Sequence, residues 1–298
     1  MNKLLVACVG LAVAANAAAA ETKSWTAIKS TVPAKAMLAV SVDVAAMRTN
    51  IKAFMPTFEA LVAKEGDVKQ AVTMFKSLCS IDIASSISDV SVVMDHDGKG
   101  IIALGLDGLD EGKLVACMNK VVAQGDPKAK VGVKPGKVTE YAFGPSQKLY
   151  ARWAAKDVVV VSTDPEHREI LDAALKGKAL QGDMGKLAAK VGTGIAWVVG
   201  APGEKDVKMG YGQITLAAGK LTANAHIIPG DAKKGAEMLT EAKTQLPKAA
   251  AQMQSKSKAL AKIVNSIKVS GTGADIVFDA SMTTDEASAI APDLLQAL

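Results

Sequence analysis

Histidines are the residues of this chain that could carry proton transfer or metal chemistry. There are three, His96, His167 and His226. A zinc site needs ligands at short fixed spacings, and a catalytic triad needs a nucleophile in a recognisable setting. Neither an H-E-x-x-H nor a G-x-S-x-G motif accompanies these histidines. We therefore predict three solvated histidines, with His226 on the polar face of a strand. The alternative is a hydrolase with an unrecognised site that uses His226 and a distant serine.

An acidic turn resembles the opening of a calcium-binding EF-hand loop, with Asp95, Asp97 and Gly100 in the expected order. That loop needs oxygen ligands at alternate positions and an acidic residue at the twelfth. Lys99 occupies a ligand position and Leu106 the twelfth. The segment is therefore predicted to be a hairpin turn.

Two further patterns could bind anions. The G-x-G pairs at 210–212 and 271–273 lack the strand-to-helix context of a dinucleotide site and favour turns. The lysine-rich stretch at 241–265 suits an anionic partner such as a phospholipid head group, although a solvated helix face is the simpler interpretation. The net charge of +5 is mild and aromatic residues make up 4%, which excludes a typical nucleic-acid surface. We predict no catalytic residue, no cofactor and no metal ligand.

Residues 1–20 indicate a secretory signal peptide cleaved after Ala20. The segment has Lys3, an apolar run over 4–13, and alanines in an A-x-A pattern. Cys8 comes too early to be the lipidated cysteine of a lipoprotein, so lipidation is the minor alternative. Beyond residue 20 no stretch reaches membrane-span length without a charge, and we predict no transmembrane segment in the mature chain. The expected location is the periplasm or the outside of the cell.

Cys79 and Cys117 remain after cleavage. In an oxidising compartment an even pair of cysteines is most simply a disulfide. Cys117 lies at helical spacing on an apolar face, and Cys79 ends the preceding helical stretch. The alternative is two separate buried thiols. Neither cysteine belongs to a C-x-x-C motif, which argues against redox catalysis and zinc binding.

The elements that would position these residues follow one repeated order. Residues 213–227 alternate apolar and polar side chains across Gly219, which predicts a hairpin, and a helix capped by Asp231 follows. This strand-strand-helix unit occurs four times, starting near residues 90, 149, 213 and 267. The predicted fold is α+β, with antiparallel sheets and helices packed on one face. Internal duplication is the sharper hypothesis, and the alternative is that so common a unit recurs by chance.

The predicted boundaries of the modules and of individual helices follow from separate local signals. Residues 21–33 are polar and indicate a loosely held lead-in, and we predict one module over 21–178 and a second over 179–298. Pro247 is expected to end a helix and Pro292 to split the last one. The last helix is predicted to start at a capping box of Thr283 and Glu286.

Several short segments together resemble a group of uncharacterised exported bacterial proteins that are known only as domains of unknown function. These segments are Val32-Pro33, Ser41-Val42-Asp43, Leu78-Cys79-Ser80-Ile81-Asp82, the strand at 89–93 and the helix that carries Cys117. The resemblance implies a periplasmic or secreted α+β protein with a structural bridge between Cys79 and Cys117. It carries no catalytic residue across.

The leading expectation is a non-enzymatic exported protein of the bacterial envelope, with a binding or structural role and a partner such as an envelope protein. A periplasmic carrier of a lipid or other apolar ligand is the alternative, because methionine-rich faces suit adaptable apolar sites. The methionines that suggest it are Met74, Met94, Met118, Met238 and Met253.

Overall fold

The computed structural model describes residues 21–33, 35–64, 66–143, 148–164, 166–203, 205–255 and 257–297. The predicted signal peptide and Cys8 lie outside these residues. The chain forms two compact units: an N-terminal unit of 21–45 and 59–181, and a C-terminal unit that contains 46–58 and 182–298. The predicted boundary was 178/179. In the structure the later boundary lies at 181/182, and residues 46–58 also belong to the C-terminal unit.

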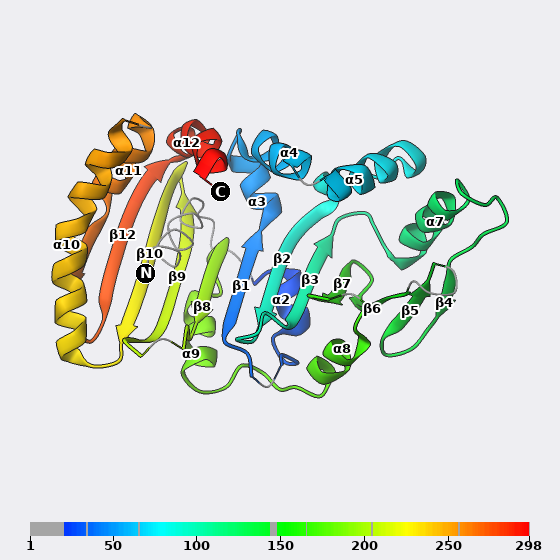
Figure 1. Ribbon diagram of the computed structural model, residues 1–298, viewed down its shortest axis with the longest axis horizontal. Helices are drawn as coiled ribbons and strands as arrows, with labels where there is room; N and C mark the ends of the chain where they lie inside the picture. The colour runs from blue at the N-terminus through cyan, green and yellow to red at the C-terminus, as the bar shows by residue number, and fades with distance from the viewer. Residues whose placement is uncertain are drawn as a thin grey trace. The chain divides into compact units, whose positions relative to one another are not determined.

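The N-terminal unit is built on an antiparallel sheet. Its described strands follow the order β1-β2-β3-β7-β6-β5-β4 (Figure 1). They are β1 (Leu38–Asp43), β2 (Ile87–Met94), β3 (Gly100–Leu106), β4 (Gly132–Lys134), β5 (Thr139–Ala142), β6 (Lys148–Ala155) and β7 (Val158–Ser162). The antiparallel register runs across the sheet from Ser41 of β1 through Ser91 and Ala103 to Val160 of β7.

Helices in the first part of the chain are α2 (Lys23–Ile28), α3 (Val44–Asn50), α4 (Phe54–Lys64), α5 (Gly66–Cys79), α6 (Ile83–Ser86), α7 (Glu111–Val122) and α8 (Arg168–Leu175). The division between the two units passes through α3 and α4. One side of the N-terminal sheet packs with α7 around a core of Leu106, Leu109, Met118, Val131, Tyr141, Ala151 and Val159.

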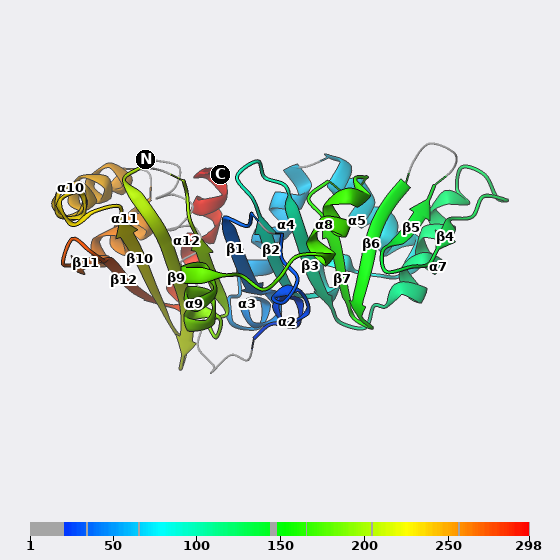
Figure 2. The same ribbon diagram turned by 90° about the horizontal axis from the view of Figure 1, so that it is seen from below.

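Residues 21–33 are not the loosely held lead-in that was predicted. They contain α2, which lies beside β2 and β3 (Figure 2). Trp25 and Ile28 of this helix are buried. The prediction was wrong because α2 is only six residues long, and its burial depends on strands distant in sequence.

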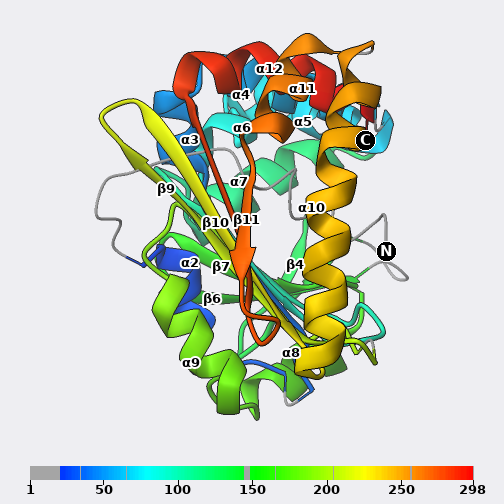
Figure 3. The same ribbon diagram turned by 90° about the vertical axis from the view of Figure 1, so that its left-hand side faces the viewer.

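The C-terminal unit has the described strands β8 (Ala196–Gly200), β9 (Val207–Ala217), β10 (Lys220–Pro229), β11 (Lys268–Gly271) and β12 (Ile276–Thr283), in the order β8-β9-β10-β12-β11. Its helices are α9 (Gly182–Val191), α10 (Ala232–Gln254), α11 (Lys258–Ser266) and α12 (Thr284–Ala297). Figure 3 shows α9 and α10 on opposite sides of the strands.

Both units share one strand order. The spatial order β1-β2-β3-β7-β6 in the N-terminal unit corresponds to β8-β9-β10-β12-β11 in the C-terminal unit. The predicted strand-strand-helix order occurs as β2-β3-α7, β6-β7-α8, β9-β10-α10 and β11-β12-α12. The α+β class with antiparallel sheets is confirmed. Helices nevertheless lie on both faces within each unit: α2 lies opposite to α7 in the N-terminal unit, and α9 opposite to α10 in the C-terminal unit. Internal duplication stays a prediction.

Several local predictions can be checked directly. The Asp231 cap is confirmed, because its Oδ1 accepts the Lys234 N–H at 2.8 Å. The capping box is also confirmed: Thr283 N–H donates to Glu286 Oε2 at 2.9 Å, and Glu286 N–H donates to Thr283 Oγ1 at 3.1 Å.

The predicted effects of two prolines were wrong. Pro247 lies inside α10, and α12 likewise runs through Pro292. A proline inside a helix removes one hydrogen bond, and packing can offset that loss. Ala250, one turn beyond Pro247, is buried, and α10 packs along α11.

One glycine pair is also placed differently from the prediction. Gly210 and Gly212 lie inside β9 and not in a turn. A Cβ at Gly212 would come within 3.0 Å of the Asn224 carbonyl oxygen on β10. Glycine therefore permits a close approach of two strands here.

Candidate functional site

His226 is the centre of the most elaborate polar arrangement in the C-terminal unit. It lies on β10, in register with Tyr211 of β9. Its Nδ1 is 2.9 Å from Asp275 Oδ1, and its Nε2 is 2.8 Å from Asn224 Oδ1. The side chain is only 14% exposed, so the prediction that His226 is solvated was wrong.

One face of the His226 ring is covered by an aromatic stack. The Tyr211 and His226 rings are parallel within 6°, with centroids 4.4 Å apart. Lys190 of α9 donates to the Tyr211 hydroxyl at 3.1 Å, and its Nζ lies 5.0 Å from the centre of that ring. The Tyr211 ring of β9 therefore covers one face of the imidazole, and Lys190 of α9 contacts that ring.

The hydrogen-bond partners orient the side-chain amide of Asn224 in this network. Asn224 Nδ2 donates to Asp279 Oδ1 at 2.7 Å, so the amide oxygen of Asn224 faces His226 Nε2. The Asp275 carboxylate faces Nδ1. Both ring nitrogens thus face acceptors, and neither is directed at a nucleophile. The chain Asp275–His226–Asn224–Asp279, the His226 network, ties β10 to β12 and to the turn before it.

A second polar group lies in the N-terminal unit, under α2. The Asp89 carboxylate is 4% exposed and lies close to the first turn of the helix. The Ser24 backbone N–H donates to Asp89 Oδ1 at 2.7 Å, and Ser88 Oγ donates to Oδ2 at 2.7 Å. A Cβ at Gly105 would lie 2.1 Å from Asp89 Oδ2, so glycine on β3 leaves room for the carboxylate.

Four hydroxyl groups continue this buried cluster. Thr22 and Ser24 come from the start of α2, Ser41 from β1 and Ser91 from β2. The oxygen pairs Thr22–Ser41, Ser41–Ser91 and Ser24–Ser91 are each 2.8 Å apart. Ser24, Ser41 and Ser91 have no exposed surface. Sequence reasoning missed this cluster, and the available signal was the presence of Ser41, Ser91 and Asp89 inside two otherwise apolar strands.

The third polar centre is the phenol of Tyr141 on β5. Its hydroxyl donates to Glu111 Oε1 of α7 at 2.6 Å and accepts from Trp153 Nε1 of β6 at 2.9 Å. Burial, followed by the hydrogen bond to Glu111, raises the pKa of Tyr141 well above its ordinary value. The hydroxyl therefore stays protonated and joins the helix to the sheet.

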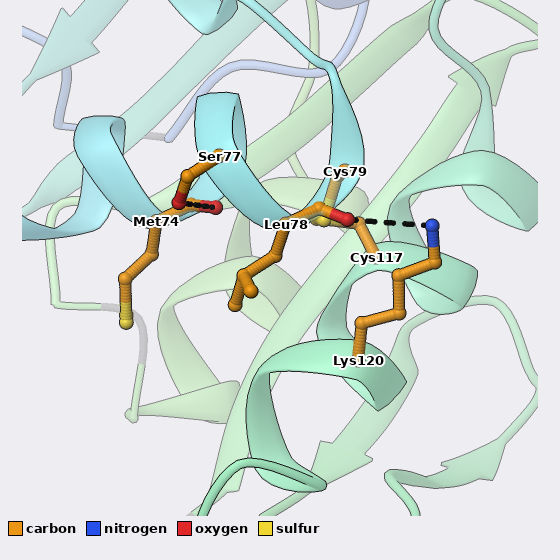
Figure 4. The surroundings of a disulfide bond; sticks show 6 residues. All are labelled: Met74, Ser77, Leu78, Cys79, Cys117 and Lys120. Atoms are coloured by element: carbon orange, nitrogen blue, oxygen red, sulfur yellow. Dashed lines mark hydrogen bonds between the residues drawn. A yellow bond between two sulfur atoms is a disulfide. The ribbon is translucent and has the colours of Figure 1, made fainter.

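Cys79 and Cys117 form a disulfide in the structure, with Cα atoms 5.3 Å apart (Figure 4). The bond joins the end of α5 to the middle of α7. Cys117 is 2% exposed, and Lys120 Nζ donates to the Leu78 carbonyl oxygen at 3.4 Å beside the bond. The cysteines thus act as a tie between two helices.

A shallow pocket of about 390 Å³ lies next to this disulfide. It is lined mainly by polar side chains: Ser80, Asp82, Ser85, Ser86, Asp107 and Lys113, with Cys79, Ile81, Gly108 and Leu109. Burial opposes the ionisation of Asp82, but hydrogen bonds from Ser85 and Lys76 hold its pKa below the ordinary value. The lining includes none of the methionines that suggested an apolar carrier.

The remaining sequence candidates are surface features. Asp95 Oδ1 accepts the N–H groups of Asp97 at 2.9 Å and Lys99 at 3.0 Å, which confirms the predicted hairpin turn. His96 and His167 are 80% and 56% exposed, as predicted. Within the described residues no group of three or more His, Cys, Asp or Glu side chains could hold a metal. No helix in the described part of the chain is long and apolar enough to cross a membrane.

Comparison with known proteins gives limited results. No family model matches the sequence, and no curated protein matches it. Crystal form III of the protein TP0453 is a similar solved structure, with a TM-score of 0.47 and 9% sequence identity over 91% of this chain and 98% of that chain. Crystal form IV gives 0.44 and 9% over 90% and 99%, and crystal form I gives 0.44 and 10% over 88% and 94%.

Proposed function

We propose that this chain is an exported, non-enzymatic protein of the bacterial envelope with a binding or structural role. The observation that carries the proposal is the His226 network. An imidazole that acts as a general base needs one nitrogen free to take a proton from the reacting group. Both nitrogens of His226 are instead engaged within 3.0 Å by Asp275 and Asn224.

Other buried groups with chemical potential support the same proposal. The Asp89 carboxylate is engaged by Ser24 and Ser88, and the Tyr141 hydroxyl by Glu111 and Trp153. The Ser24–Asp89, Tyr141–Glu111 and Trp153–Tyr141 contacts each join two secondary-structure elements, whereas the Ser88–Asp89 contact lies within β2. Satisfied buried polar groups of this kind specify a unique packing.

Turnover assays test the non-enzymatic part. The chain beginning at Glu21 is assayed against a nitrophenyl ester, a nitrophenyl phosphate and a denatured protein substrate, together with the variants His226→Ala and His96→Ala. We expect no turnover above buffer for any of the three proteins. Turnover that His226→Ala abolishes and His96→Ala retains would establish the hydrolase alternative and overturn the proposal.

The intact mass of the protein from its native compartment tests the exported part. We expect a chain that begins at Glu21 and gains two hydrogens on reduction. A chain that retains residues 1–20, or one lipidated at Cys8, would contradict the proposed processing. The same spectrum recorded under native conditions addresses the carrier alternative, because a bound lipid that co-purifies would favour it.

A further inference from the structure

The two cysteines of the disulfide differ in how completely the fold covers them. Cys117 lies in the middle of α7, with helical turns before and after it, and is 2% exposed. Cys79 is the last residue of α5 and is half-buried (Figure 4). The chain leaves α5 at Ser80, whose φ of 55° is left-handed, so no further turn of this helix covers Cys79. The disulfide is therefore more open at its Cys79 end.

This open end borders the polar pocket of about 390 Å³. Cys79 lines the pocket, and Cys117 is not among the described residues that line it. Sites for small molecules have volumes of roughly 300 to 1,000 Å³, so the pocket can admit a small organic thiol. The route from solvent to the disulfide therefore leads to Cys79 first.

An attacking thiolate is an anion, and the charges around the pocket do not oppose its approach. The carboxylates of Asp82 and Asp107, which line the pocket, each bind a lysine Nζ, at 3.3 Å and 3.2 Å respectively. Lys113 also lines the pocket, is exposed, and donates to the uncharged carbonyl oxygen of Gly108. Its ammonium group adds a positive charge that attracts the thiolate, weakened by solvent and salt.

We propose that Cys79 is a thiol-exchange site, at which a small external thiol forms a mixed disulfide while the protein stays folded. The external thiolate attacks Cys79 Sγ and forms a new sulfur–sulfur bond to it. The bond between Cys79 and Cys117 breaks, its electron pair stays on Cys117 Sγ, and that sulfur takes a proton from water. One disulfide replaces another, so the step needs no oxidant. The proposal does not depend on the envelope role proposed above.

Packing between the helices allows the exchange to occur without unfolding. Phe75 of α5 and Ile81, just beyond it, pack against the same core as Leu114 of α7. The Lys120 Nζ hydrogen bond to the Leu78 carbonyl oxygen also remains when the covalent bond opens. Exchange at Cys79 therefore converts a covalent tie between α5 and α7 into a non-covalent one.

Reaction of the folded parent protein with reduced glutathione tests the proposal without any substitution. The chain beginning at Glu21 is incubated with excess glutathione, quenched in acid to stop exchange, and mapped by peptide mass spectrometry. We expect glutathione on Cys79 and a free thiol at Cys117. In urea, which removes the difference in burial, we expect both cysteines to carry glutathione.

Two single-cysteine variants measure the same asymmetry from the reduced side. Cys117→Ser leaves the Cys79 thiol and Cys79→Ser leaves the Cys117 thiol, and each variant is treated with glutathione disulfide. Each rate is divided by the rate of the same variant in urea, which corrects for intrinsic reactivity. The normalised rate of Cys79 should exceed that of Cys117 on the order of a hundredfold, because Cys117 reacts only after local opening.

A matched pair of substitutions tests the route through the pocket. Ser85→Trp fills the pocket from its lining, whereas Ser77→Trp adds the same side chain to exposed α5 surface outside the lining. We expect the first to slow glutathione exchange severalfold and the second to leave it unchanged. Lys113→Gln should slow exchange severalfold and weaken its dependence on salt.

Three results would overturn the proposal. They are glutathione on Cys117 in the folded parent, exchange that begins only in urea, and equal slowing by the two tryptophan substitutions. None of them bears on the turnover assays or on the processed mass, so the proposed function is tested separately.

Discussion

The two units share a strand order but treat the polar side chains on one face of their sheets differently. In the N-terminal unit α2 extends over β2, β3 and β7, and it encloses the Asp89 cluster completely. In the C-terminal unit α9 packs on β8 and β9, and the His226 network lies beside it on β10 and β12. Asp275 remains 44% exposed there.

The difference follows from the charges to be accommodated. The first cluster has one carboxylate and several hydroxyls, which a helix N-terminus and a serine can satisfy without water. The second has two carboxylates and an imidazole, whose complete burial would carry a large desolvation penalty. The same strand order therefore accommodates a buried polar cluster in one unit and a partly exposed one in the other. The outcome depends on which strands the covering helix packs against.

The largest expected effect concerns the disulfide, which only the N-terminal unit has among the described residues. Cys79→Ser together with Cys117→Ser opens a tie that spans 38 residues and should lower the free energy of unfolding by about 4 kcal/mol. Hydrogen exchange measured by mass spectrometry should show faster exchange in β2, β3 and α7 and little change in β9 and β10. Reduction of the parent protein is the control. Equal acceleration in both units would show that they are not separately stabilised.

The next effect concerns the enclosed carboxylate. Asp89→Ala leaves the Ser24 N–H and the Ser88 hydroxyl buried without their acceptor and should cost about 3 kcal/mol in the free energy of unfolding. Asp89→Asn keeps one acceptor oxygen for Ser24 and should cost less. Urea denaturation curves of both variants provide the measurement. An alanine variant as stable as the parent would show that α2 docks without this contact.

A smaller effect is expected in the C-terminal unit, because the His226 network is partly solvated. His226→Ala should lower the free energy of unfolding by about 1 to 2 kcal/mol, through the loss of its hydrogen bonds and of the stack on Tyr211. His226→Phe retains a stacking ring and should recover part of this loss. If the phenylalanine variant were no more stable than the alanine variant, the hydrogen bonds would carry the whole effect.

The smallest effect is a pH dependence at α2. Lys23 Nζ binds Asp157 Oδ2 at 2.7 Å, and this hydrogen bond is the main reason why the pKa of Asp157 is below its ordinary value. A lowered carboxyl pKa stabilises the fold above the ordinary value of about 4, and the stabilisation is lost as the pH falls through the lowered pKa. Because both side chains are well exposed, Lys23→Gln should cost only a few tenths of a kcal/mol at neutral pH. The denaturation midpoints of the variant and the parent protein should become equal in acid. If the difference between the midpoints persisted there, the Lys23–Asp157 ion pair would not be the cause of that difference.

The sequence allowed the strand-strand-helix units to be predicted because their signals are local. Alternating apolar residues, a glycine at the bend and a capping Asp231 all lie within one short window. β4 escaped prediction because a three-residue exposed strand has no apolar alternation. The short helix α2 escaped prediction because its stabilising contact with Asp89 joins residues 65 positions apart.

The candidate site was less predictable than the fold. His226 was correctly placed on the polar face of a strand, but its burial depends on a ring from β9 and a carboxylate 49 residues away. No local pattern contains these partners. The pairing of the two cysteines was easier to predict, because an even number of cysteines in an oxidising compartment favours a disulfide.

The contacts of α2 join residues that are far apart in the sequence, and this determines when the α2 segment can become ordered during folding. Its first turn contacts Ser41 and Asp89, and Lys23 binds Asp157, which is 134 residues away. As the chain is synthesised, residues 22–28 appear early, but their last partner appears only after most of the N-terminal unit. Contacts of such wide sequence separation form slowly. The α2 segment is therefore expected to be one of the last parts of the N-terminal unit to become ordered, and until then it is accessible to chaperones and proteases.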